Sequence, residues 1–172
     1  CIKFRNEVNK IDVNKNKIVH GFGDFNSEIL FIGEGPGSRG AAITGIPFTR
    51  DISGRILQKS LVRLGISKND YRLIDKNFKP TRDSLKCFLT DVFRCYNYKL
   101  VKKSDEKFKK YNEHCLEHLK NEIGALNNLK KIRIIGIDGT KKFLNVYLDK
   151  LEKMYDTKCI THPSYYKNFF YK

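Results

Sequence analysis

The sequence predicts an α/β protein: a single-domain, three-layer α/β/α fold around a central, mostly parallel four-stranded sheet. Short apolar runs typical of buried strands alternate along the chain with longer amphipathic segments typical of helices. This alternation gives a parallel sheet with helices on both faces. The chain has 172 residues, of which 40% are hydrophobic, so it is large enough to bury a core. No repeat or linker divides it, and residues 1–172 are expected to form one domain.

The expected elements follow one another in chain order. Residues 28–35 read EILFIGEG, an apolar run that ends in glycine and indicates a buried parallel strand. Residues 52–66 carry isoleucine and leucine at helical spacing and include Gly65, a common helix stop. Further strands are expected at residues 86–95, 131–137 and 158–164, and further helices at about residues 104–123 and 140–154.

The charge of the chain favours a polyanionic partner. Lysine and arginine number 34 against 19 aspartate and glutamate residues, which gives a formal net charge of +15. The excess is spread along the chain, which indicates a basic face on a folded domain. No apolar run approaches the roughly 18 residues that a membrane span needs, and no signal peptide is evident. Nucleic acid, and no membrane, is therefore the expected partner of a cytoplasmic protein.

The ends of the predicted strands carry the residues suited to a functional site. They read GEGPG, TDVFRC, GIDGT and THPS. Ligands of open parallel sheets gather at the carboxyl ends of the strands. Glycine allows the backbone to approach a ligand closely, and carboxylate and imidazole groups supply chemistry. The sequence therefore predicts a binding or catalytic site at this edge.

Three segments, in this order, resemble the uracil-DNA glycosylase superfamily, and most closely its iron–sulfur branch, the fourth and fifth families. They are VHGFGDFNSEILFIGEGPGSRGAAITGIPFTRDISGRIL at residues 19–57, LTDVFRC at residues 89–95 and HPS at residues 162–164. GFGD and TGIPFTRDISG are similar to the fifth family, and GEGPG to the fourth. The resemblance spans most of the chain. It implies an enzyme that flips a base out of DNA and cleaves its N-glycosidic bond.

The resemblance implies that Gly33, Gly35, Phe48 and Asp91 bind the flipped base. Glycines at the end of the first strand would let backbone amides approach the base, and Phe48 would stack on its face. By residue type alone, Phe48 also suits the hydrophobic core. Asp51 precedes the next helix and is expected to cap it, with a direct catalytic role as the alternative.

His162 and Glu34 are the expected catalytic residues. In the superfamily the histidine that matches His162 stabilises negative charge on the leaving base, and a preorganised donor at the base's O2 lowers the barrier. Classical members activate water with an aspartate where this sequence has Gly35. Glu34 matches a carboxylate of the fourth family and could polarise water or stabilise the cationic sugar.

Asp91 stands where the family usually has an asparagine, which reads uracil with both halves of its amide. An ionised aspartate only accepts hydrogen bonds, so it would repel O4 of uracil and suit an amino group such as N4 of cytosine. A protonated Asp91 in a buried pocket would instead mimic asparagine. Two substrates therefore stay open: uracil, which the family implies, and a cytosine-type base, including a modified one.

The resemblance also implies an iron–sulfur centre. Cys1, Cys95 and Cys115 match three of the four cysteines that hold a [4Fe–4S] cluster in this branch, and the fourth would precede Cys1. The cluster would tie the N-terminal segment, residues 1–27, to the rest of the domain. Zinc is the alternative metal, because three thiolates together with His114 or His118 would complete a tetrahedral set.

The resemblance places Ser164, Tyr165, Tyr166 and Lys167 against DNA, with a tyrosine filling the vacated stack and Lys167 on a phosphate. The prediction is a monomeric, monofunctional DNA glycosylase. It would flip uracil or a related modified pyrimidine out of DNA and hydrolyse its N-glycosidic bond, leaving an abasic site. One alternative is a glycosylase for a cytosine-type base, acting in defence against foreign DNA. The other is a non-catalytic nucleic-acid-binding iron–sulfur protein.

Overall fold

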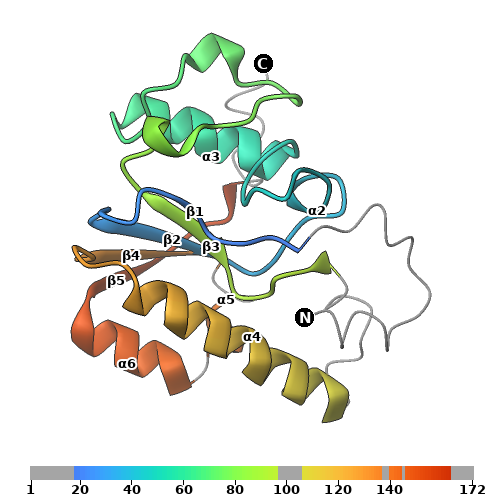
Figure 1. The fold of residues 1–172 in the computed structure, drawn as a ribbon, viewed down its shortest axis with the longest axis vertical. Helices are drawn as coiled ribbons and strands as arrows, with labels where there is room; N and C mark the ends of the chain where they lie inside the picture. Colours follow the sequence, from blue (N-terminus) through green and yellow to red (C-terminus); the bar gives the residue numbers. More distant parts are fainter. Residues whose placement is uncertain (1–17, 97–105, 137–139, 145, 164–172) are drawn as a thin grey trace.

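The computed structural model describes residues 18–96, 106–136, 140–144 and 146–163. A five-stranded sheet crosses the middle of the molecule, with strand order β1-β3-β2-β4-β5 (Figure 1). All neighbours pair in parallel except β1, which is antiparallel to β3. The strands are β1 (Phe22–Gly23), β2 (Ile29–Gly33), β3 (Phe88–Asp91), β4 (Lys131–Ile135) and β5 (Asp156–Ile160).

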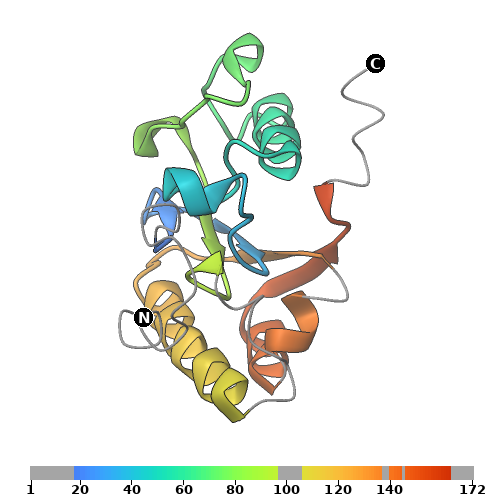
Figure 2. The same ribbon diagram turned by 90° about the vertical axis from the view of Figure 1, so that its right-hand side faces the viewer.

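Helices cover both faces of this sheet, which confirms the predicted layered α/β fold (Figures 1 and 2). On one face lie α2 (Ala41–Thr44) and α3 (Ile52–Arg63). On the other lie α4 (Glu106–Gly124), α5 (Thr140–Leu144) and α6 (Val146–Met154). The short 3-10 helices η1 (Tyr71–Leu73) and η2 (Arg82–Ser84) lie between α3 and β3 in the chain. None of the described helices is long and apolar enough to cross a membrane.

The sheet differs from the expected one by an additional strand. β1 has only two residues, so it carries no alternation that a sequence pattern could reveal. It pairs Phe22 with Leu89 and Gly23 with Phe88 at the edge of the sheet. The expected helix over residues 140–154 is present as α5 and α6, and residue 145 lies outside the described residues.

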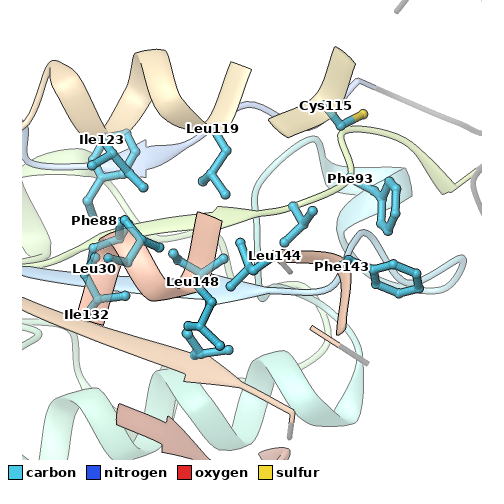
Figure 3. Close-up of a cluster of buried hydrophobic side chains, with 14 of the residues drawn as sticks. Leu30, Phe88, Phe93, Cys115, Leu119, Ile123, Ile132, Phe143, Leu144 and Leu148 are labelled. Carbon is cyan, nitrogen blue, oxygen red and sulfur yellow. The ribbon is translucent and has the colours of Figure 1, made fainter. Parts of the chain in front are cut away.

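The central strand β2 is apolar throughout because both of its faces are buried. Leu30 and Ile32 point into a hydrophobic cluster between the sheet and α4, α5 and α6, whereas Phe31 joins a smaller cluster beneath α3. Figure 3 shows the larger cluster, in which Leu30 of β2 faces Leu148 of α6 and Leu119 of α4 lies above them. This packing fixes the strand ends that carry the predicted motifs.

A buried ion pair joins the N-terminal part of the described chain to β3 and α4. Arg94 is 2% exposed, and its Nη2 lies 2.8 Å from Oε2 of Glu122. The other nitrogen, Nη1, donates to Oε1 of Glu122 and to Oγ1 of Thr90, both at 2.9 Å. Glu122 Oε1 also accepts from the backbone N–H of Gly21, and the N–H of Val19 donates to the carbonyl of Arg94. Direct hydrogen bonds therefore anchor this part of the predicted N-terminal segment.

Candidate active site at the strand ends

A cavity of about 170 Å³ lies at the carboxyl ends of the strands. Residues from the loop after β2, from α2 and α3, from the end of β3 and from the segment after β5 line it. This volume is below the roughly 300 Å³ of pockets for drug-sized ligands, so it suits one small ring. The lining residues are Gly35, Pro36, Gly37, Ala41, Phe48, Asp51, Ser53, Asp91 and His162.

Four residues that the sequence analysis selected meet in this cavity: Gly35, Phe48, Asp91 and His162. They come from three separate segments of the chain, and the parallel register brings the ends of β2 and β3 side by side, with Gly33 opposite Asp91. Their functional roles stay predictions. Other parts of the wall, such as Ala41, were not predicted, although the density of glycines from residue 33 to 40 was a signal of close approach.

Gly33 is the point at which Phe48 and Asp91 converge. A Cβ atom at Gly33 would collide with Oδ1 of Asp91 and would lie 2.6 Å from Cζ of Phe48. Any side chain larger than hydrogen would therefore displace both groups. Gly33 is not itself on the cavity wall. It makes room for two residues that are.

The loop that carries Phe48 has an unusual backbone. Phe48 has φ 51° and Arg50 has φ 70°, in the left-handed region that residues other than glycine seldom adopt. Such conformations persist where surrounding contacts impose them, and they cluster at functional sites. Here Gln58 Nε2 donates to the carbonyl of Phe48 at 3.2 Å. Thr49 Oγ1 donates to the carbonyl of Ile46 at 2.8 Å, which fixes the next residue.

Gly54 allows this loop to rest on α3. A Cβ atom at Gly54 would lie 2.5 Å from the carbonyl carbon of Phe48 and 2.7 Å from N of Thr49. Both contacts are with backbone atoms, which cannot rotate away as a side chain can. By helix propensity alone, replacing an interior glycine with alanine stabilises a helix by up to about 1 kcal/mol.

Gly54→Ala is therefore expected to destabilise the protein, whereas a glycine-to-alanine change inside a helix usually stabilises it. We expect it to lower the free energy of unfolding by at least about 1 kcal/mol, as overpacking does, because the Phe48 backbone must move. Gly124→Ala at the end of α4 is the matched control, since no atom lies within 4 Å of a Cβ there. Urea denaturation of both variants is the measurement. A Gly54→Ala protein as stable as the wild type would contradict the tight contact.

Asp51 caps α3, which confirms the expected structural role. Its Oδ1 accepts a hydrogen bond of 2.8 Å from the backbone N–H of Gly54. Its other oxygen faces the loop after β2, where a Cβ at Gly37 would lie 2.6 Å from Oδ2 and one at Gly40 would collide with it. Asp51 also lines the cavity. One carboxylate thus joins the start of α3, the glycine loop and the cavity wall.

Asp91 is a buried carboxyl with little compensation for a negative charge. Burial is the main cause that raises its pKa to about 7. The guanidinium of Arg94 lowers that pKa, but the charges of Asp51, Glu122 and Glu34 raise it further. Arg94 is held on both sides of its fork by Glu122, so its positive charge is already matched by a carboxylate. The surroundings of Asp91 therefore favour the neutral carboxyl more than water does.

His162 reaches the cavity from the segment after β5 and is half-buried. It passes close to the end of β4, where a Cβ at Gly136 would lie 3.8 Å from Cδ2 of His162. Gly136 has φ 91°, which a residue with a side chain would adopt only with strain. The N–H of Gly136 donates to the carbonyl of Ile160 at 3.0 Å, which holds the two strand ends together.

Glu34 follows Gly33 directly and is half-buried, but it is not among the cavity-lining residues. Its backbone carbonyl accepts from the N–H of Phe93 at 3.0 Å. Its side-chain charge is close enough to raise the pKa of Asp91. The catalytic role of Glu34 stays a prediction. The four predicted DNA contacts, Ser164, Tyr165, Tyr166 and Lys167, lie outside the described residues.

Two of the predicted metal ligands share one buried polar cluster. Cys95 and Cys115 are both buried, and Cys95 Sγ lies 2.6 Å from Oη of Tyr111. Burial raises the pKa of Cys115 to about 11, although the nearby Arg94 backbone N–H opposes this shift. Backbone N–H groups directed at sulfur are typical of the surroundings of iron–sulfur centres. The two thiols are the right donor type for such a centre and share Tyr111 as a partner, but the raised pKa of Cys115 opposes the thiolate form that a metal binds.

The described part of the chain brings no further metal ligands to this cluster. No group of three or more metal-binding side chains occurs among those residues. Cys1 lies outside them. His114 and His118 approach each other on α4, with their Nε2 atoms 3.3 Å apart. The metal centre therefore stays a prediction.

The small cavity at the strand ends thus brings together an aromatic ring, a buried carboxyl and a histidine. Residues 20–170 match the family described as the Uracil DNA glycosylase superfamily. This match covers most of the chain, so the protein belongs to the uracil-DNA glycosylase superfamily and is a DNA glycosylase. It identifies the superfamily and not the iron–sulfur branch.

A solved structure supports the same fold. The wild-type SMUG2 of Pedobacter heparinus is similar to this chain with a TM-score of 0.57 and 16% sequence identity. The similarity covers 84% of this chain and 71% of the SMUG2 chain. At this identity the comparison bears on the fold alone. No curated protein matches the chain.

Proposed function

We propose that this DNA glycosylase is a monofunctional, monomeric hydrolase that removes a pyrimidine base from DNA and leaves an abasic site. The observation that carries the proposal is the meeting of Phe48, Asp91 and His162 around one small cavity in a member of this superfamily. Each of the three offers a different interaction to a flipped pyrimidine: stacking, hydrogen bonding to its edge, and stabilisation of developing charge.

Two side chains, His162 and Glu34, divide the chemistry of the step. The bond between C1′ of the sugar and N1 of the base breaks, and its electron pair passes to the pyrimidine. An N–H of His162 directed at O2 of the base would stabilise that negative charge. A water molecule adds to C1′ of the cationic sugar and gives up a proton, and the pyrimidine anion takes up one proton to leave as the neutral base. Glu34 is the proposed carboxylate for the water or the sugar, because Asp51 already uses one oxygen to cap α3.

Asp91 is the proposed reader of the base edge. Protonated, it offers one donor and one acceptor, as an asparagine amide does, and it suits uracil. Ionised, it offers only acceptors and suits the amino group of a cytosine-type base. A pKa of about 7 supports the presence of both forms near neutral pH. Uracil or a related modified pyrimidine is the first candidate substrate, and this carboxyl is the observation that favours a cytosine-type base as the second.

An iron–sulfur centre near Cys95 and Cys115 is a further part of the proposal. The two buried thiols and the N–H of Arg94 near Cys115 support it. A structural cluster there would brace the loop that follows β3. Asp91 is the last residue of β3 and lies next to that loop. Analysis of iron and inorganic sulfide in the purified full-length protein is the test. Stoichiometric zinc without iron would contradict the cluster.

The proposed reaction is tested by its product. Oligonucleotides that carry uracil, thymine, cytosine or a modified cytosine at one position are incubated with the protein and then heated with or without alkali. We expect strand cleavage only after alkali and only with a uracil-type or cytosine-type base. Cleavage without alkali would indicate a lyase, and intact strands from every substrate would contradict a pyrimidine glycosylase.

A further inference from the structure

A second cavity, of about 680 Å³, lies between α4 and the helices α5 and α6, and we call it the α4–α6 groove. Figures 1 and 2 show these helices on the face of the sheet opposite α2 and α3. Among the described residues, none lines both this groove and the cavity at the strand ends. The volume lies within the roughly 300–1,000 Å³ of ligand-binding cavities, and the proposed excision of a base makes no use of it.

The floor of the α4–α6 groove is apolar. It is formed by Leu116 of α4, Leu144 at the end of α5 and Tyr147 of α6. Leu144 is buried, whereas Leu116 and Tyr147 are half-buried and pack against the main hydrophobic cluster. Burial raises the pKa of the Tyr147 phenol to about 12, so the phenol is neutral and adds no negative charge to the floor.

The rim of the groove is basic. Lys109 and Lys120 of α4 and Lys150 of α6 line it, and all three are exposed, whereas Glu113 is the single acidic residue among the described lining residues. Lys109 and Lys120 each pair with a glutamate one turn away on α4, at 3.4 and 3.6 Å. Exposed pairs of this kind contribute little, so both ammonium groups can exchange partners. Lys150 forms no ion pair with another described residue.

An apolar floor with a basic rim matches an acidic amphipathic helix, which docks its apolar stripe in a groove and carries its charges beside it. Lys109 and Lys120 are eleven residues apart on α4, which corresponds to roughly 17 Å, or about three helical turns. A helix of that length can therefore place carboxylates at both ends of the floor.

Two other occupants fit the groove less well. Sites for single-stranded nucleic acid stack bases on open aromatic faces, but Nζ of Lys120 lies over the Tyr147 ring, 5.6 Å from its centroid. A second copy of this chain would bring a formal net charge of +15 against the lysines.

We propose that the α4–α6 groove binds an acidic amphipathic helix of a protein partner. The apolar side chains of that helix contact Leu116, Leu144 and Tyr147, and its carboxylates pair with the three lysines of the rim. The groove is separate from the cavity at the strand ends, so the partner binds without taking the place of the base. The contact attaches the glycosylase to another protein and goes beyond the proposed reaction.

The test selects binders from a phage-displayed library of random peptides about 16 residues long, enough for roughly 24 Å of helix, with the full chain as bait. We expect enriched peptides to carry apolar residues at helical spacing and an excess of aspartate and glutamate. In fluorescence anisotropy, Lys150→Glu should raise the Kd of a labelled enriched peptide by at least about tenfold. Lys120→Glu should act in the same direction. A peptide with lysine in place of its acidic residues should bind Lys150→Glu better than the wild type.

Lys153→Glu is the matched control, because Lys153 is exposed on the same helix and does not line the groove. It makes the same change in net charge and should leave the Kd nearly unchanged. Equal weakening by Lys150→Glu and Lys153→Glu, or no enriched peptide of this composition, would overturn the proposal. A single-stranded oligonucleotide whose Kd is raised by Lys150→Glu and not by Lys153→Glu would also overturn it, in favour of a nucleic-acid site. Peptide binding does not depend on excision, so a failure of the proposed reaction leaves this test intact.

Discussion

Replacing His162 with alanine is expected to lower the single-turnover rate of base excision by about 100-fold or more, with little change in the Kd for DNA. The loss of one preorganised donor at a developing anion has this magnitude, on the order of 3 kcal/mol in the activation free energy. The effect falls on the rate because the charge on the base's O2 develops only as the glycosidic bond breaks. Among the described residues, no other histidine and no lysine lines the cavity, so no neighbouring side chain can replace His162.

His20→Ala is the matched control for this measurement, because His20 is exposed and does not line the cavity. It should leave the excision rate unchanged. The informative comparison is the single-turnover rate at saturating protein against the Kd from anisotropy. Parallel losses in both quantities for His162→Ala would show that His162 contributes to DNA binding in general, and the charge-stabilising role would then fail.

Asp91→Asn is expected to stabilise the protein, and more so at higher pH. The folded-state pKa of about 7 lies above the value of about 3.9 in an unfolded chain. The folded protein therefore disfavours ionisation, and wild-type stability falls as the pH rises from about 4 through about 7. An asparagine at this position does not titrate. Between pH 5 and pH 8 the variant should gain on the order of 2 kcal/mol relative to the wild type.

Urea denaturation of both proteins at the two pH values measures this gain. Several other groups near Asp91 carry charge, including Arg94, Glu122, Asp51 and Glu34. These groups are common to both proteins, so the difference between the two pH profiles isolates Asp91. A stability difference that is the same at pH 5 and pH 8 would show that Asp91 is ionised throughout, and an ionised carboxyl would then be the reader of the base.

Much of the fold could be predicted because the strongest signals are local. β2 is buried on both faces, so its continuous apolar run was recognisable, and the amphipathic pattern of α3 ended at a glycine. The meeting of Phe48, Asp91 and His162 was predictable because Asp91 and His162 stand in recognisable motifs at strand ends and Phe48 in the motif that continues from β2. Parallel strands bring such ends to one edge of a sheet.

Other features depend on long-range contacts that leave no local pattern. The pairing of Arg94 with Glu122 spans 28 residues, and no local pattern reveals it. The residue types disfavour the left-handed backbone of Phe48 and Arg50, and Phe48 is in contact with α3 through Gly54 and Gln58. β1 is too short for a periodicity, and its pairing with β3 is set by the chain around Gly21, which Glu122 holds.

In the proposed reaction a pyrimidine enters this cavity and Asp91 reads its edge. The most direct measurement is the ratio of single-turnover excision rates on matched uracil and cytosine-derivative oligonucleotides, for the wild type and for Asp91→Asn. We predict that the wild type is weak on uracil for its superfamily and that Asp91→Asn shifts the ratio toward uracil by about tenfold or more, since a mispaired buried polar group costs roughly 1–3 kcal/mol. Robust removal of uracil by the wild type, with the same ratio in Asp91→Asn, would show that Asp91 does not read the base.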